Sequence, residues 1–201
     1  MKTFKINYAA RTMLSFFSFN IGWWACALGA SHGYPWLGPA SLPFFIGLHL
    51  YFAPAPKGET LFLLLLGAIG FVIDTCLLKI QFFTITDAEF APLWLVAMWI
   101  LMGQTYESML MMRQKRWLLC LSGAFSGPLS YYCFEALGLL NYARPLWLSL
   151  IFHGLIWAAL TPGFFLLRDW ALRFAGFRPT VLVQPVAAVE PESPSPIQRD
   201  S

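Results

Sequence analysis

Two acidic residues stand inside apolar stretches of this sequence and are its first candidates for chemistry. Asp74 lies in GAIGFVIDTCLLKI, residues 67–80, and Glu135 lies in GPLSYYCFEALG, residues 127–138. Keeping a carboxyl group away from water is costly, so such a residue normally has a hydrogen-bonding or charged partner and often a task. Protonation is the cheapest response of a carboxyl group to apolar surroundings, so a proton-linked step is chemically available to both residues.

Helical spacing indicates where these acids point, because each continues a row of small residues on one helical face. The two rows are Gly67, Gly70 and Asp74, and Gly123, Gly127, Tyr131 and Glu135. Small residues line helix contacts inside membranes. We therefore expect both acids to face the interior of a helix bundle.

Position along the apolar segments predicts that His153 lies at the same depth in the membrane as Asp74. With a rise of 1.5 Å per residue, Asp74 and His153 both lie about 5 Å to one side of the membrane midplane, and Glu135 lies about 10 Å to that side. We predict an outer polar binding pocket formed by Asp74, Tyr131, Glu135 and His153. His153, directly or through one water, or Tyr131 is the expected partner of Asp74, because Lys79 lies about 140° around the same helix.

A second pair of polar residues, His49 and Glu107, lies about 7 to 8 Å to the opposite, inner side of the midplane. Two interpretations remain open for both groups. In the first, the polar side chains tie helices together, with hydrogen bonds worth roughly 1 kcal/mol or less each. In the second, they line a cavity for a proton, a lipid headgroup or a small solute.

The sequence lacks the motifs of familiar catalytic and metal sites. It contains no HExxH, no GxSxG and no glycine-rich phosphate loop, and its three histidines and four cysteines have no metal-binding spacing. We therefore predict no metal, no cofactor and no nucleic-acid partner, and we assign no catalytic residue. A lipid-modifying enzyme that uses Asp74 or Glu135 as a general acid remains an alternative.

Composition indicates a membrane protein with several spans. The 201 residues are 58% hydrophobic and only 11% charged, which is outside the range of soluble domains. A helix needs about 20 apolar residues to cross roughly 30 Å of hydrocarbon. Six segments approach that length, at residues 13–30, 36–53, 60–80, 91–112, 117–138 and 146–167. The predicted fold is all-α, a bundle of six transmembrane helices within residues 1–168.

The distribution of basic residues predicts the orientation of this bundle. If the N-terminus is cytoplasmic, eleven of the thirteen basic residues lie inside, and only Lys79 and Arg144 lie outside. Both termini are then cytoplasmic. Residues 169–201 form a cytoplasmic segment, in which RDWALRFAGFRP, residues 168–179, is expected as a short helix along the inner membrane surface. A disordered, proline-rich tail follows.

Four segments together carry a family resemblance: FNIGWWACALGA, the Asp74 region, APLWLVAMW and GPLSYYCFEALG. They resemble a domain-of-unknown-function family of small six-helix proteins of the bacterial inner membrane, often encoded beside cyclopropane-fatty-acyl-phospholipid synthases. The resemblance covers about residues 13–167. It implies an inner-membrane location and a relation to lipid-modifying enzymes, and it implies no catalytic residue.

These observations favour a non-enzymatic inner-membrane protein that binds or moves a lipid-related or small solute. Its expected partners are membrane lipids and lipid-modifying enzymes, to which it would be an accessory. The alternatives are a membrane-embedded lipid-modifying enzyme and a purely structural membrane partner protein. A cavity open to the outer side or to lipid, and lined by the predicted outer pocket residues, would favour binding or catalysis over the structural role.

Overall fold

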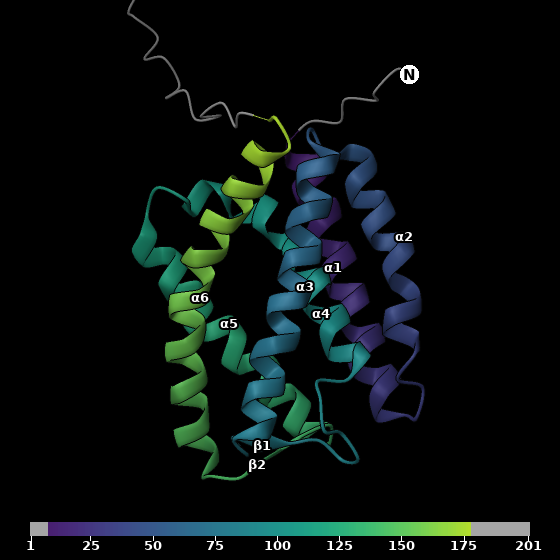
Figure 1. Cartoon of the computed structure of the whole chain (residues 1–201), viewed down its shortest axis with the longest axis vertical. Coiled ribbons are helices and arrows are strands. Elements are labelled where there is room, and N and C mark those ends of the chain that lie inside the picture. Colours follow the sequence, from purple (N-terminus) through teal and green to yellow (C-terminus); the bar gives the residue numbers. More distant parts are fainter. Residues whose placement is uncertain (1–7, 178–201) are drawn as a thin grey trace, which may run out of the picture.

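Helices account for most of the chain, and most of them run along the long axis of the molecule (Figure 1). The structure, a computed structural model, describes residues 8–177, and the predicted proline-rich tail lies outside these residues. The six α-helices are α1 (Tyr8–Ser31), α2 (Leu37–Phe52), α3 (Pro56–Lys79), α4 (Leu93–Gly103), α5 (Arg116–Ala136) and α6 (Leu146–Phe174). The predicted helical fold and the presence of six helices are confirmed.

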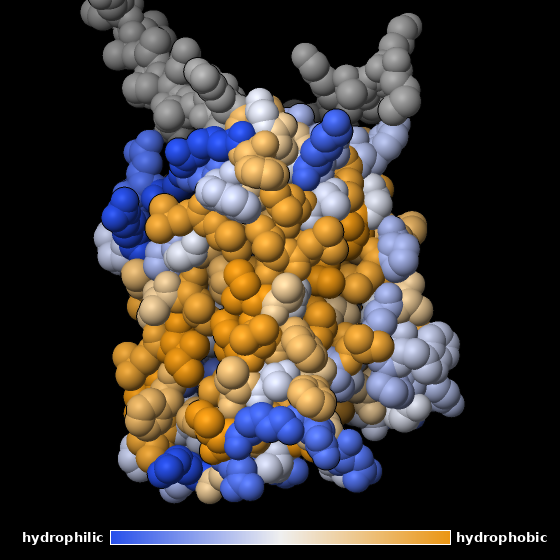
Figure 2. Space-filling model, viewed as in Figure 1, coloured by the Kyte–Doolittle hydropathy of each residue, from blue (hydrophilic) through white to orange (hydrophobic). Residues whose placement is uncertain are grey.

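Three of these helices are long and apolar enough to cross a membrane, namely α1 from Ala9 onward, α3 and α6. Large hydrophobic side chains are exposed on the helix surfaces, among them Phe125, Leu129 and Leu155. Figure 2 shows the resulting hydrophobic band, with hydrophilic residues at its two ends. These are the features of a membrane protein, because apolar side chains face the lipid.

The fourth predicted span is not one α-helix. Residues 91–112 form the eleven-residue α4 followed by a nine-residue 3-10 helix, η1 (Gln104–Met112). Two hydroxyl groups bond to carbonyls three residues back, Thr105 to Met102 at 2.7 Å and Ser108 to Thr105 at 2.6 Å. Such local bonds compete with the α-helical pattern. With rises of 1.5 and 2.0 Å per residue, the two pieces together extend about 34 Å.

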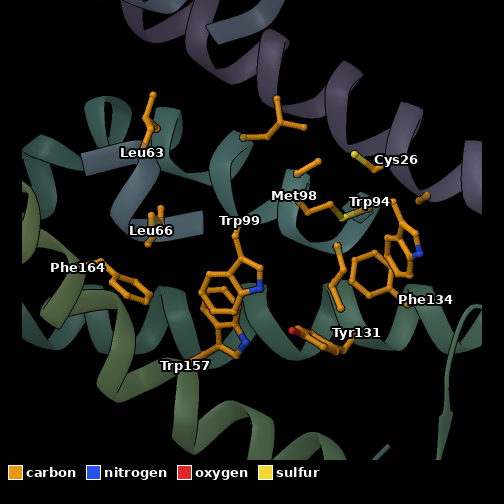
Figure 3. Packing of buried hydrophobic residues seen from close by; sticks show 14 of the residues in the cluster. Cys26, Leu63, Leu66, Trp94, Met98, Trp99, Tyr131, Phe134, Trp157 and Phe164 are labelled. Atoms are coloured by element: carbon orange, nitrogen blue, oxygen red, sulfur yellow. The ribbon is translucent and has the colours of Figure 1, made fainter. Parts of the chain in front are cut away.

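One glycine on α3 and one on α5 pack against tryptophans of neighbouring helices. A Cβ atom on Gly70 would come within 2.1 Å of the Trp99 ring, and one on Gly127 would come equally close to Trp157. The two indoles stack with their centroids 4.8 Å apart and an interplanar angle of 14°. Figure 3 shows this stack at the centre of the core. The predicted glycine rows therefore do lie at helix contacts, where each makes room for an indole.

Two short strands join the loops at the end of the molecule where α3 finishes. The strands β1 (Phe83–Thr84) and β2 (Asn141–Tyr142) pair antiparallel, with Phe83 opposite Tyr142. The pairing places Tyr142 over α6, beside His153. This contact between two loops was not predicted, because two-residue strands leave no periodic pattern in a sequence.

Helix α6 continues without a break past the predicted boundary at residue 168, and it ends at Phe174. Of the stretch expected to form a separate helix on the membrane surface, residues 168–174 instead extend the last long helix. Asp169, Ala171 and Leu172 are buried against the rest of the bundle. The last two turns of α6 are therefore part of the packed structure.

Candidate functional site

Asp74 is fully buried and accepts two hydrogen bonds through its carboxylate. The Trp99 Nε1–H donates to Oδ2 at 2.6 Å, and the Tyr131 hydroxyl donates to Oδ1. Figure 3 shows the Tyr131 side chain beside the stack of Trp99 and Trp157. The three residues come from α4, α5 and α3, so the carboxylate holds three helices together. Asp74 faces the bundle interior as predicted, with Tyr131 as one of its partners.

His153 is buried beside this cluster but has a different hydrogen-bond partner. Its ring stacks on that of Tyr131 with centroids 4.0 Å apart, and its Nδ1 lies 2.8 Å from the Tyr142 hydroxyl. The predicted direct bond between His153 and Asp74 is not among the contacts of residues 8–177, because Trp99 and Tyr131 take the two carboxylate oxygens. Within the same residues, His153 Nε2 has no hydrogen-bond partner.

Tyr142, in the short strand β2 between α5 and α6, contacts the cluster through His153. Burial raises the pKa of its phenol, and the nearby carboxylates of Glu135 and Asp74 raise this pKa further. The phenol therefore stays neutral and keeps its proton for hydrogen bonding. Sequence reasoning missed Tyr142, which reaches the site only through the β1–β2 pairing.

Among residues 8–177, neither Glu135 nor Lys79 bonds to Asp74. Glu135 is only partly buried, and the buried face of α5 continues from Tyr131 to Phe134. Lys79 lies 3.7 Å from the Glu89 carboxylate, consistent with the expectation that it does not pair with Asp74. The structure thus brings three of the four predicted pocket residues into contact and leaves Glu135 outside.

A cavity of about 40 Å³ lies beside this cluster, between α1 and α5 and over α4. Its wall residues include Phe19, Trp23, Met98, Met102, Ser130 and Phe134. Trp99 and Tyr131, the two donors to Asp74, also line it. Trp23 stacks on Phe134 with centroids 5.5 Å apart and thereby joins α1 to α5 along the wall. We call this cavity the lateral groove. It has room for roughly three water-sized groups.

His49 and Glu107 lie together at the other end of the bundle, on the wall of a smaller cavity of about 10 Å³. The His49 Nδ1 lies 3.4 Å from the Ser15 hydroxyl, and its Nε2 lies 3.8 Å from a carboxylate oxygen of Glu59. Glu107 accepts hydrogen bonds from Arg11 and, at 3.4 Å, from Arg168. Each predicted residue therefore has a charged partner that was not predicted.

His49 and Glu107 belong to one buried ion network, which Glu59 and Arg168 connect. Arg168 Nε donates to Glu59 at 3.2 Å, and its Nη2 bonds to the other oxygen of that carboxylate. Two arginines, Arg11 and Arg168, balance two glutamates, Glu59 and Glu107. We call these four residues with His49 the inner network. It joins α1, α2, α3, η1 and α6.

Sequence reasoning missed Glu59 and Arg168 because it placed them outside the bundle. The predicted segments 60–80 and 146–167 each ended one residue short of these charges. One feature of the sequence could have indicated this pair. Glu59 and Arg168 have opposite charges, and they lie next to the ends of two predicted segments on the same side of the membrane. Two such charges at equal depth are candidates for an ion pair.

The chemistry available at these sites is mainly structural. Among residues 8–177, no three histidine, cysteine or acidic side chains converge to form a metal site. The Asp74 carboxylate has no exposed surface, and both of its oxygens accept hydrogen bonds. This arrangement ties three helices together. The lateral groove is the part of the site with space for a ligand.

Asp74→Leu should destabilise the protein by roughly 2–5 kcal/mol, because it leaves the buried donors of Trp99 and Tyr131 without an acceptor. Asp74→Asn should cost much less, since the amide oxygen accepts from Trp99 and the amide group donates to the tyrosine hydroxyl. Unfolding in detergent measures both. Lys79→Leu, at an exposed pair on the same helix, serves as the control, with an expected effect below about 1 kcal/mol. Equal stability of the two Asp74 variants would contradict the assignment.

Arg168→Met should cost about 3–5 kcal/mol, because it leaves Glu59 as a buried charge without its arginine. Removing the acid together with the arginine, in Glu59→Leu with Arg168→Met, should recover part of the loss. Arg173→Met is the matched control, since Arg173 is exposed five residues further along α6. The buried ion pair is refuted if the Arg168 and Arg173 variants unfold alike.

The chain matches no curated protein and no solved structure. It does match a family model described as a protein of unknown function (DUF2878), over residues 12–163. The matched region begins in α1 and ends in α6, so it includes Asp74, both of its donors, the lateral groove, and Glu59 and Glu107 of the inner network. The match covers most of the chain, and this protein belongs to the DUF2878 family of proteins of unknown function.

Proposed function

We propose that this protein is a non-enzymatic, multi-pass protein of the bacterial inner membrane that holds a short segment of the apolar chain of a lipid-related ligand in the lateral groove. The observation that carries the proposal is the groove itself. It is lined mainly by aromatic and aliphatic side chains, and two of its buried donors, Trp99 and Tyr131, are already bonded to Asp74. A ligand there meets mostly carbon, as in other apolar binding sites.

The surroundings of the lateral groove favour a ligand that enters from the bilayer. Phe16 on α1 and Leu129 on α5 are more than half exposed, as expected of side chains that face lipid. Ser130 supplies a hydroxyl in the groove wall for one polar group of the ligand. A lipid tail with a single carbonyl or hydroxyl group suits this combination better than a charged solute, because burying an unpaired charge is costly.

Six membrane crossings are part of this proposal. At 1.5 Å per residue, α5 extends about 32 Å and α2 about 24 Å, and the combination of α4 and η1 extends about 34 Å. The first turns of α1 and the last turns of α6 lie at the same end of the molecule (Figure 1), as an even number of crossings requires. The excess of basic residues at that end supports a cytoplasmic location for both termini.

The bacterial location and the accessory role in lipid modification rest on the resemblance to proteins encoded beside cyclopropane-fatty-acyl-phospholipid synthases. A lipid-binding groove is compatible with such a role, since a lipid held by its tail can be presented to a separate enzyme. The sealed carboxylate of Asp74 favours this role over catalysis within the chain. A purely structural role remains the competing proposal and predicts an empty groove.

A reporter enzyme that is active only in the periplasm should stay silent when it is fused after Ser201. The same reporter fused after Asp87, in the loop between α3 and α4, should be active, because that loop follows the third crossing. Activity measured in intact cells separates the two positions. The reverse pattern, or activity at both positions, would overturn the orientation or the number of crossings.

A phospholipid with a photoreactive group on its acyl chain should label the lateral groove, with modified peptides containing Met98 and Met102. Ser130→Phe should lower this labelling about tenfold, because the added ring fills a groove with room for only roughly three water-sized groups. Leu129→Phe adds a ring of the same size at the neighbouring lipid-facing position and should leave the labelling unchanged. Labelling that Ser130→Phe does not reduce would favour the structural role.

A further inference from the structure

Exposed basic residues gather where α5 begins and α6 ends. Arg113, Lys115 and Arg116 are exposed along the turn between η1 and α5, and Arg173 is exposed in the last turn of α6. Asp169 brings two of them together. Its carboxylate accepts a hydrogen bond from Arg113, and its backbone carbonyl accepts one from Arg173 at 3.3 Å. We call the four basic residues the basic collar.

The acids at this end of the bundle are already paired. Glu59 pairs with Arg168, Glu107 with Arg11, and Asp169 with Arg113. In the part of the chain that the structure describes, seven basic residues here face three acidic ones, which leaves a formal charge of +4. The residues that carry this excess are Lys57, Lys115, Arg116 and Arg173. The excess positive charge at this exposed end can attract an external anion.

Exposed aromatic rings stand next to the basic collar. Trp117 directly follows Arg116 and is 63% exposed, and Trp170 stacks on Phe174 with centroids 5.3 Å apart. Figure 2 shows hydrophilic side chains at this end bordering the hydrophobic band. Tryptophan beside basic residues at such a border is typical of the membrane–water interface, where the ring reaches the headgroup layer. A soluble acidic partner or a nucleic acid explains the charge but not these rings.

We propose that the basic collar, together with Trp117, is a binding surface for the headgroup of an anionic phospholipid. The lipid phosphate accepts hydrogen bonds from the exposed guanidinium and ammonium groups. Its acyl chains continue along the lipid-facing side of α5 and α6, where Leu121 and Leu166 are exposed. This surface is independent of the lateral groove, whose walls contain none of the collar residues.

The test titrates the full-length protein in a neutral detergent with phosphatidylglycerol and, separately, with phosphatidylcholine. Phosphatidylglycerol should bind at least about tenfold more tightly, and its affinity should fall as salt is added. Lys115→Gln, Arg116→Gln and Arg173→Gln combined should remove this preference. All three side chains are exposed, so the unfolding temperature of the variant should not change. Arg144→Gln, an exposed arginine in the loop between α5 and α6, should keep the preference.

Three results would overturn the proposal. The first is equal affinity for the two lipids. The second is a preference for phosphatidylglycerol that survives in the triple variant. The third is full competition by inorganic phosphate or by an oligonucleotide at the same ionic strength, since either would assign the collar to a soluble anion. A lost preference in the triple variant with unchanged lipid labelling of the lateral groove would separate the two sites.

Discussion

The buried carboxylate of Asp74 sets the main constraint on this bundle. An acid with no exposed surface needs donors, and the two that it has come from different helices, so α3, α4 and α5 must meet at one point. The donor on α4 is an indole, a bulky ring that must fit close to α3. Gly70, one turn before Asp74, leaves the space for that ring. Gly127 does the same for Trp157, and the stack of the two indoles then brings in α6.

Part of this site could be predicted from the sequence, and the missing part has a physical cause. The glycine rows showed correctly that Asp74 and Tyr131 face the interior, because helical periodicity follows from backbone geometry. Depth alone suggested His153 as a partner, but depth does not specify the angle around a helix. Trp99 was overlooked because a tryptophan in an apolar segment is first taken as a hydrophobic residue, although its N–H is a donor. His153 entered the cluster by stacking, which leaves no sequence pattern.

The inner network shows a second limit of prediction. Hydropathy windows stop at charged residues, so Glu59 and Arg168 were left outside the predicted spans although each is at least 95% buried. Arg11 was counted only among the basic residues that predict the orientation of the bundle, and no ion pair was predicted for it. Paired charges can be buried where single charges cannot, and pairing depends on neighbours that are distant in sequence. The ends of the helices were therefore the least predictable part of the fold, and they contain its densest electrostatic contacts.

The tight winding of η1 has a consequence for these contacts. A 3-10 helix turns about 120° per residue and an α-helix about 100°, so rewinding nine residues would turn the far end of the segment by about half a revolution. It would also shorten the segment by about 4.5 Å. Glu107 lies in the first half of η1 and bonds there to arginines of α1 and α6. The winding of η1 is thus coupled to its ion pairs. If the segment relaxed to an α-helix, the Glu107 carboxylate would move away from both arginines. Intact ion pairs in turn favour the more tightly wound 3-10 form.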